Sequence, residues 1–199
     1  MNNLNNTSHR SEKEMLKSLN GETFLTNYIM SEELGLTTYN YEYCDIKAHV
    51  IEEYPIPIYL GQNRVGGNHV KTYYIDMVYI ISPGNSAVFR EECFSLGIEI
   101  KTSVKDMYRN PLQINNYFGK TDYMFLCVPS HMIEEAMDYV ESESRLGLFN
   151  LDTGEILKFP VRQEVNIEWK EKLLYRALFA DPSLPMMQFK PVDQNACDR

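Results

Sequence analysis

Runs of β-forming residues predict four strand segments in this chain. Residues 39–60 are rich in Tyr, Ile and Val with rough alternation, which favours one or two extended strands. Residues 72–82 (TYYIDMVYIIS) are a nearly continuous β-forming run interrupted by one acid, and residues 93–101 (CFSLGIEIK) end in two charges on alternate positions. Residues 121–129 (TDYMFLCVP) are an apolar run bounded by turn residues, which is typical of a central strand buried on both faces.

Two prolines and a glycine-rich stretch modify the first of these segments. Pro55 and Pro57 weaken it as a central strand, because proline cannot donate a hydrogen bond to a strand ladder. Residues 61–68 (GQNRVGGN) are punctuated by glycine and predict a mobile loop before the next strand.

Helical periodicity and helix end signals predict the remaining elements. In residues 130–142 the apolar positions share one helical face, so we interpret the acidic positions there as a solvated face. Thr153 and Gly154 divide residues 146–161 into a hairpin. The predicted helices cover residues 11–19, 111–119, 130–142 and 167–180. This order predicts an α/β fold in a single domain over residues 11–182, after a disordered stretch 1–10 and before a tail 183–199.

Composition excludes several classes of protein. The 199 residues, 44% of them hydrophobic, can bury one sizeable core. No stretch approaches the roughly 18 uncharged apolar residues of a membrane span, and the polar first residues lack a secretory pattern, so we expect a cytoplasmic protein without membrane contact. The four cysteines lie far apart without a C-x-x-C pair, which argues against a zinc ribbon or a disulfide scaffold.

Two charged residues at the end of the 93–101 strand are the first candidates for chemistry. Successive strand side chains point to opposite faces, so Glu99 and Lys101 emerge together while Ile98 and Ile100 face the other way. Asp76 lies within the strong 72–82 strand, where an unpaired carboxylate would cost several kcal/mol and therefore needs a partner. A divalent cation is one such partner.

A magnesium ion fits the oxygen donors of this set. Mg²⁺ takes oxygen ligands and keeps several waters, so the carboxylates of Asp76 and Glu99 with the carbonyl of Ile100 suffice to hold it. Such an ion polarises a phosphoryl group and acidifies a bound water, while Lys101 offsets developing charge. Phosphodiester hydrolysis is the matching reaction. The structural alternatives are a buried ion pair of Asp76 with Lys101, or a Glu99–Lys101 pair that merely ends a strand at the surface.

The spacing of the two acids sets a condition on the strands. Asp76 and Glu99 stand opposite each other on adjacent antiparallel strands only if the connection is centred near residues 87 and 88. We therefore expect residues 83–92 to form a long loop or a separate excursion.

This arrangement resembles the PD-(D/E)xK nuclease superfamily, whose αβββαβ core carries an aspartate on one strand and E-x-K on the next. More narrowly, residues 97–130 (GIEIKTSVKDMYRNPLQINNYFGKTDYMFLCVPS) resemble the MmcB-like DNA-repair-related family in E-x-K-[ST]-S, a helix with an aromatic end, and D-x-x-F-x-x-V-P. The close match covers roughly a sixth of the chain, and a looser likeness extends from residue 72 to the hairpin near residue 154. The resemblance implies a restriction-endonuclease-like core with a mixed central sheet flanked by helices, plus a C-terminal hairpin and helix.

The resemblance also assigns roles to residues. It makes Asp76 and Glu99 metal ligands and Lys101 the catalytic lysine. Gln113 and Tyr117 match the Q-x-x-x-Y pattern of RecB-type relatives and would touch the site or the substrate, unless Tyr117 is core and Gln113 surface. The superfamily often adds a glutamate from the first helix, here Glu14 rather than Glu12, although helix capping explains Glu14 equally well.

The net charge of −9 is unfavourable for a nucleic-acid enzyme, so the location of basic residues matters. Candidates for a basic rim are Arg64, His69, Lys71, Lys105, Arg109 and Lys120, and candidates for stacking surfaces, or for ordinary packing, are Tyr73, Tyr74, Tyr108 and Tyr117. The sequence thus predicts a Mg²⁺- or Mn²⁺-dependent deoxyribonuclease that acts on DNA, with a homodimer left open, and the resemblance implies a role in DNA repair or foreign-DNA processing. The rival interpretation is a catalytically inactive nuclease-fold protein that binds nucleic acid or a protein partner.

Overall fold

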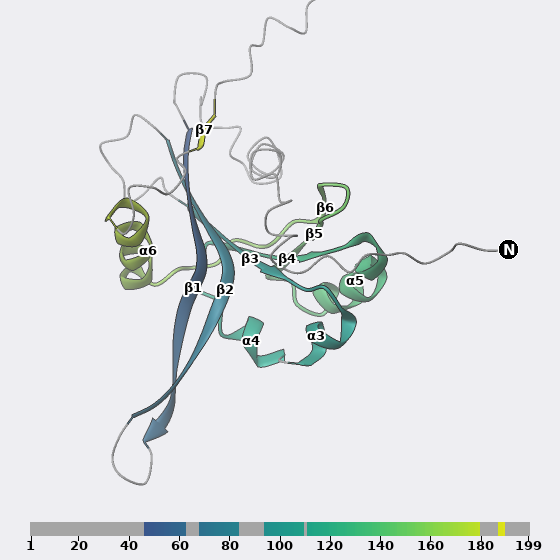
Figure 1. Ribbon diagram of the computed structural model, residues 1–199, viewed down its shortest axis with the longest axis horizontal. Coiled ribbons are helices and arrows are strands. Elements are labelled where there is room, and N and C mark those ends of the chain that lie inside the picture. The colour runs from purple at the N-terminus through teal and green to yellow at the C-terminus, as the bar shows by residue number, and fades with distance from the viewer. Residues whose placement is uncertain (1–45, 63–67, 84–93, 110, 180–186, 190–199) are drawn as a thin grey trace, which may run out of the picture.

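The computed structural model describes residues 46–62, 68–83, 94–109, 111–179 and 187–189 (Figure 1). Its strands are β1 (Ile46–Gln62), β2 (Asn68–Pro83), β3 (Phe94–Ile100), β4 (Tyr123–Val128), β5 (Leu146–Asn150), β6 (Glu155–Lys158) and β7 (Met187–Phe189). Its helices are α3 (Val104–Arg109), α4 (Pro111–Asn115), the 3₁₀ turn η4 (Ser130–Met132), α5 (Ile133–Glu141) and α6 (Ile167–Phe179).

The described strands form one mixed sheet in the order β6-β5-β4-β3-β2-β1-β7. β1, β2 and β3 are antiparallel neighbours, whereas β3, β4 and β5 run parallel. Parallel neighbours need a crossover, and here α3 with α4 connects β3 to β4 while α5 connects β4 to β5. The predicted α/β class, with a mixed sheet flanked by helices and followed by a hairpin and a helix, is confirmed.

The centre of the sheet is buried on both faces. Every residue of β3 and β4 is buried, and β4 lies between two parallel neighbours, as its uninterrupted apolar run predicts. Met124, Leu126 and Val128 of β4 belong to the same core cluster as Ala136 and Val140 of α5. The acidic face predicted for this helix is confirmed, because Glu134, Glu135, Asp138 and Glu141 are all exposed.

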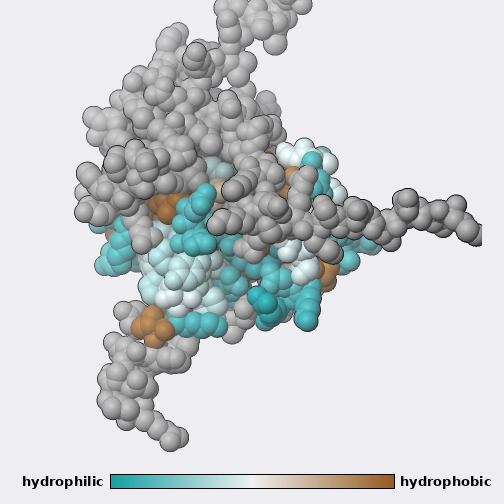
Figure 2. Space-filling view, viewed as in Figure 1, coloured by the Kyte–Doolittle hydropathy of each residue, from teal (hydrophilic) through white to brown (hydrophobic). Residues whose placement is uncertain are grey.

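The first two strands form a long hairpin that projects beyond the rest of the sheet (Figure 1). Pro55 and Pro57 pair with β2 on one side, and the described part of β7 pairs with β1 only at residues 46–48. Both prolines therefore lie where the described residues leave the other edge of β1 without a strand, which is where proline is tolerated. The described surface in Figure 2 is mostly hydrophilic, with a hydrophobic spot over this projecting hairpin.

The C-terminal half follows the sequence pattern closely. β5 and β6 form the predicted antiparallel hairpin, and Gly154 in its turn has a φ of 73°, which favours glycine. The predicted last helix is α6, which contacts β1 and β2. Three residues of the predicted tail form the short strand β7 beside β1.

The segment after β3 differs from its prediction. The predicted helix 111–119 is only five residues long, because the amides of Asn116 and Tyr117 bond the carbonyls of Gln113 and Ile114 in tight turns. A further helix, α3, precedes it and was not predicted. The Ser103 hydroxyl starts α3 by accepting a hydrogen bond from the Asp106 amide at 3.2 Å.

Several predictions lie outside the described residues. They are the disordered stretch 1–10, the helix 11–19 with Glu14, most of the loop 61–68 and all but the first residue of the connection 83–92. Within the described part of the chain, none of the helices has the length and apolar character needed to span a membrane.

Candidate functional site

Asp76 and Glu99 lie on adjacent antiparallel strands in the predicted register. Met77 of β2 pairs with Ile98 of β3, and continuing that register by one residue places Asp76 level with Glu99. The pair Met77 and Ile98 is centred between residues 87 and 88, as the predicted geometry requires. Directly opposite residues of antiparallel strands share a face, so both carboxylates emerge on the same side of the sheet.

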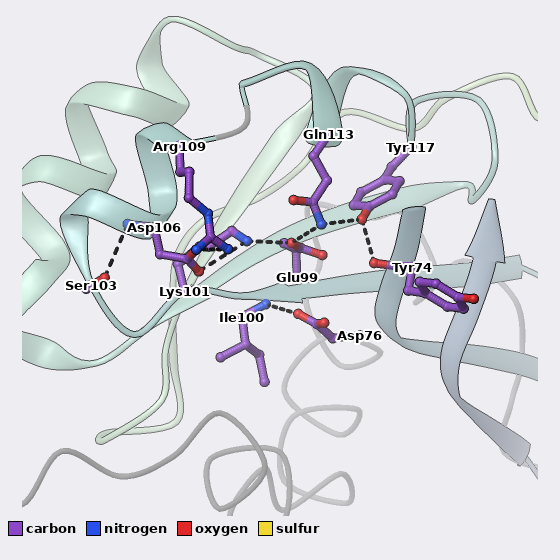
Figure 3. Close-up of polar contacts among 10 residues, drawn as sticks. All are labelled: Tyr74, Asp76, Glu99, Ile100, Lys101, Ser103, Asp106, Arg109, Gln113 and Tyr117. Atoms are coloured by element: carbon purple, nitrogen blue, oxygen red, sulfur yellow. Dashed lines mark hydrogen bonds and ion pairs between the residues drawn. The ribbon is translucent and has the colours of Figure 1, made fainter. Parts of the chain in front are cut away.

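The Asp76 carboxylate lies against the backbone of Ile100. Its Oδ2 accepts a hydrogen bond of 2.7 Å from the Ile100 amide (Figure 3). The amide and carbonyl of one extended residue point to the same side of a strand, so the Ile100 carbonyl also faces the β2 side. Asp76, Glu99 and Ile100, the three predicted metal ligands, are therefore neighbours. Over the described ranges, no group of three or more His, Cys, Asp or Glu side chains is arranged to hold a metal.

Glu99 and Lys101 form a buried ion pair. Lys101 Nζ lies 2.7 Å from Glu99 Oε1, and the two residues are 7% and 1% exposed. Strand alternation correctly predicted their shared face. The alternative in which this pair ends a strand at the surface is wrong, because β4 and the helices that follow β3 enclose the end of the strand.

Lys101 remains protonated at neutral pH. Burial by itself lowers the pKa of its ammonium, but the charge of Glu99 and the hydrogen bond to it outweigh burial, with smaller contributions from Asp106 and Asp76. The pKa of Lys101 is therefore raised above its ordinary value of 10.5. Such a group donates hydrogen bonds and supplies positive charge, and it is not a base at neutral pH.

Asp106 is a member of this cluster that the sequence interpretation missed. Its Oδ2 lies 3.5 Å from Lys101 Nζ, and its Oδ1 lies 3.0 Å from the exposed guanidinium of Arg109. Asp106 occupies the first turn of α3, three residues after the capping Ser103. The S-x-x-D pattern directly after E-x-K was the available signal, since it predicts a helix start there.

Gln113 and Tyr117 connect Glu99 to β2. Gln113 Nε2 donates to Glu99 Oε1 at 3.0 Å and to the Tyr117 hydroxyl at 2.6 Å. The Tyr117 hydroxyl in turn donates to the carbonyl of Tyr74 at 2.5 Å, as Figure 3 shows. Tyr117 is completely buried, and burial, followed by the charge of Glu99, raises the pKa of its phenol. Tyr117 is thus a core residue and also part of the hydrogen-bonded site.

Glu53 of β1 is a second residue that sequence reasoning missed. It lies between the pairs Glu52–Met77 and Tyr54–Ile75, so the register places it opposite Asp76. Its φ is 50°, in the left-handed region that costs a residue with a Cβ atom about 1 to 2 kcal/mol. No sequence signal predicts the positive φ of Glu53, because glutamate has no preference for that conformation.

The predicted basic and aromatic candidates divide between exposed and packed positions. Lys71 and Lys105 are exposed, and Lys71 Nζ lies 4.4 Å from the centre of the Tyr73 ring. Lys120 Nζ lies 4.3 Å from the centre of the Trp169 ring of α6. Arg64, Glu14 and the side chain of His69 lie outside the described residues.

A second polar cluster lies at the opposite ends of β3 and β4. Asp122 Oδ2 accepts hydrogen bonds of 2.9 Å from both the amide and the hydroxyl of Ser95, and its Oδ1 lies 3.3 Å from Arg162 and 3.8 Å from Lys170. A pocket of about 410 Å³ opens beside it, lined by Asp122, Arg162, Gln163, Glu164, Val165 and Lys170. None of the predicted site residues lines this pocket, so the sequence candidates belong to the Glu99 cluster alone.

Comparisons with known proteins leave the family of this chain open. No family model matches it, and no curated protein matches it. Among solved structures, it is similar to the SPO1766 protein of unknown function from Silicibacter pomeroyi, with a TM-score of 0.43 and 17% sequence identity. That alignment covers 65% of this chain and 71% of the other. At this TM-score the likeness carries no argument about function.

Proposed function

We propose that this protein is a metal-dependent nuclease with a restriction-endonuclease-like core of the PD-(D/E)xK superfamily, similar to the MmcB-like family, and that it hydrolyses DNA phosphodiester bonds in repair or foreign-DNA processing. The observation that carries the proposal is the juxtaposition of Asp76, Glu99 and Lys101. Asp76 of β2 lies level with Glu99 of the adjacent strand β3, and the Lys101 ammonium lies 2.7 Å from Glu99.

The donor atoms at this point fit a hard divalent cation. Two carboxylates and one backbone carbonyl offer only oxygen, which is the ligand type that Mg²⁺ and Mn²⁺ share. Asp76, Glu99 and the Ile100 carbonyl would hold the ion, which supplies an acidified water and a polarised phosphoryl group when bound.

The chain's own residues supply the remaining functions. Lys101, kept protonated by Glu99 and Asp106, donates a hydrogen bond and offsets negative charge on the phosphate oxygens as the bond to the leaving oxygen breaks. Gln113 fixes one oxygen of Glu99 by donating to it, and Tyr117 fixes Gln113. The site is thus held in place by side chains that are themselves hydrogen-bonded, as efficient catalysis requires.

A cleavage panel tests this proposal. The purified full chain is incubated with single-stranded, duplex, branched and damaged DNA in Mg²⁺ or Mn²⁺, beside Lys101→Met and the control Lys172→Met, which alters an exposed lysine of α6. We expect cleavage by the parent and the control, and a loss on the order of a hundredfold or more in Lys101→Met. If no substrate is cut, or if Lys101→Met cuts as well as the parent, the nuclease proposal is wrong.

The alternative is a catalytically inactive protein of the same fold that binds nucleic acid or a protein partner. The net charge of −9 and the engagement of Lys101 by two carboxylates favour it. DNA binding without cleavage by the parent in the same panel would support this alternative.

A further inference from the structure

Tyr74 is an exposed aromatic residue close to the candidate centre. It lies on β2 two residues before Asp76, so strand alternation places both side chains on one face about 7 Å apart along the strand. Half of Tyr74 (50%) is exposed, whereas Asp76 is half-buried and Ile75 between them is fully buried. A large ring is therefore accessible two residues along β2 from Asp76.

The backbone of Tyr74 is tied to the same centre. Its carbonyl accepts from Tyr117, whose hydroxyl accepts from Gln113, and Gln113 also donates to Glu99. Figure 3 shows this chain of contacts, with the Tyr74 ring directed away from Tyr117, Glu99 and Asp76. Three hydrogen bonds through a buried phenol thus fix the backbone of Tyr74 relative to the carboxylate of Glu99.

The other tyrosines among the candidates are less available. Tyr117 is buried and Tyr73 is half-buried under the Lys71 ammonium. Tyr108 is exposed, but its ring already meets Tyr139 edge-on with centroids 5.7 Å apart. Across the hairpin from Tyr74 stands Pro55, a small and rigid neighbour that leaves the ring accessible.

We infer that Tyr74 is a stacking platform for an unpaired nucleobase next to the phosphate that is cleaved, and that the protein therefore prefers single-stranded DNA or a frayed end. This inference rests on the proposed nuclease function. Bases inside a duplex already stack on both faces, so away from duplex ends only an unpaired base can lay a face on an exposed tyrosine. The offset of about two strand residues from Asp76 suits a base attached to a nucleotide adjoining the metal-bound phosphate.

Three variants of Tyr74 and one control variant test the platform. Tyr74→Phe keeps the ring and loses the hydroxyl, Tyr74→Leu keeps apolar bulk without a π face, and Tyr74→Ala removes both. Ile167→Ala is the control, because Ile167 is a large apolar residue of α6 that is 68% exposed. Thermal unfolding of each full-length variant establishes that it is folded before binding is compared.

Affinities for a labelled single strand and a blunt duplex of the same sequence are measured by fluorescence anisotropy in Ca²⁺, and cleavage of both is measured in Mg²⁺. We expect Tyr74→Ala and Tyr74→Leu to lose about tenfold in affinity for the single strand, with duplex binding unchanged within about twofold. Tyr74→Phe and the control retain the parental preference. A 2-aminopurine placed at successive positions of the strand should be quenched at one position by the parent and by Tyr74→Phe, but not by Tyr74→Leu.

The outcomes separate this inference from the nuclease proposal. If the parent cleaves DNA but Tyr74→Ala keeps its preference for the single strand, the platform is wrong and the nuclease stands. The platform is also wrong if the parent binds the single strand and the duplex equally well, or if Tyr74→Ala loses the same affinity for the duplex as for the single strand. If the parent cleaves nothing while binding depends on the Tyr74 ring, the nuclease proposal fails and the base-binding role remains.

Discussion

The carboxylate of Asp76 accepts a hydrogen bond of 2.7 Å from the backbone amide of Ile100, the residue between Glu99 and Lys101. The contact joins the strand that carries one proposed ligand to the strand that carries the other two. It also separates two roles of Asp76, since any oxygen can accept the hydrogen bond whereas the negative charge of the carboxylate strengthens the binding of a cation.

Asp76→Asn should therefore lose metal affinity while keeping the fold. The amide oxygen of asparagine can still accept from Ile100, so we expect the free energy of unfolding to change by no more than about 1 kcal/mol. Affinity for Mn²⁺, measured by isothermal titration calorimetry, should fall on the order of tenfold or more, because a charged ligand is lost. The control is Asp138→Asn, which removes an exposed charge from α5. Equal Mn²⁺ affinity in parent and Asp76→Asn would contradict the proposed role.

The charge of Lys101 should make the free energy of unfolding depend on pH in the alkaline range. Its folded pKa is raised above the unfolded value, so its contribution is complete below about pH 10.5 and is lost as the pH rises through the folded pKa. Lys101→Met lacks this group. The difference in the free energy of unfolding between the parent and Lys101→Met, measured in urea, should therefore shrink as the pH rises above about 10. A difference that is independent of pH would show that the Lys101 charge is not linked to folding.

Tyr117→Phe should destabilise the protein and also weaken the positioning of Gln113, which donates a hydrogen bond to Glu99. Removing the hydroxyl leaves the partly buried Tyr74 carbonyl without its donor and Gln113 without one acceptor, which costs about 1 to 3 kcal/mol. Because the three residues form one chain, the losses in Tyr117→Phe and Gln113→Leu should not add. A double-mutant cycle in urea measures the coupling, and simple additivity would argue against a shared network.

Glu53→Gly should stabilise the protein. Glycine adopts a φ of 50° without the steric cost that glutamate bears, so we expect a gain of about 1 kcal/mol in the free energy of unfolding. The neighbouring Glu52→Gly is the matched control. Glu52 is also exposed and lacks a positive φ, so glycine there should cost about 0.5 to 1 kcal/mol. Changes of the same sign in the two variants would contradict the assigned backbone strain.

Much of the fold follows from patterns that a single sequence displays. The apolar run of β4 predicts burial on both faces, and the acidic and apolar stripes of α5 predict its orientation, because side-chain period reports directly on environment. Alternation in β3 likewise placed Glu99 beside Lys101. The condition that Asp76 and Glu99 stand opposite each other also predicts the register that β2 and β3 adopt.

The rest depends on tertiary contacts that local patterns do not report. Asp106 joins the site because α3 lies over the end of β3. The pattern of Ser103 and Asp106 indicates the start of that helix, but six residues are too few to show which of its faces meets the site. Tyr74 and Tyr117 are the same residue type, yet one is exposed and the other buried, since neighbouring elements decide which ring is covered. The positive φ of Glu53 arises within the pairing of β1 with β2 and has no sequence signature.

Because the site depends on the register between β2 and β3, it is sensitive to a shift in strand pairing that leaves the secondary structure intact. A slip of one residue would turn Asp76 to the other face and separate it from Glu99, while helix and strand content stayed the same. Circular dichroism would not register such a shifted form. Misfolded molecules in a preparation, or variants altered in residues 84–93, would then resemble the native protein in circular dichroism and differ from it in packing and in cation binding.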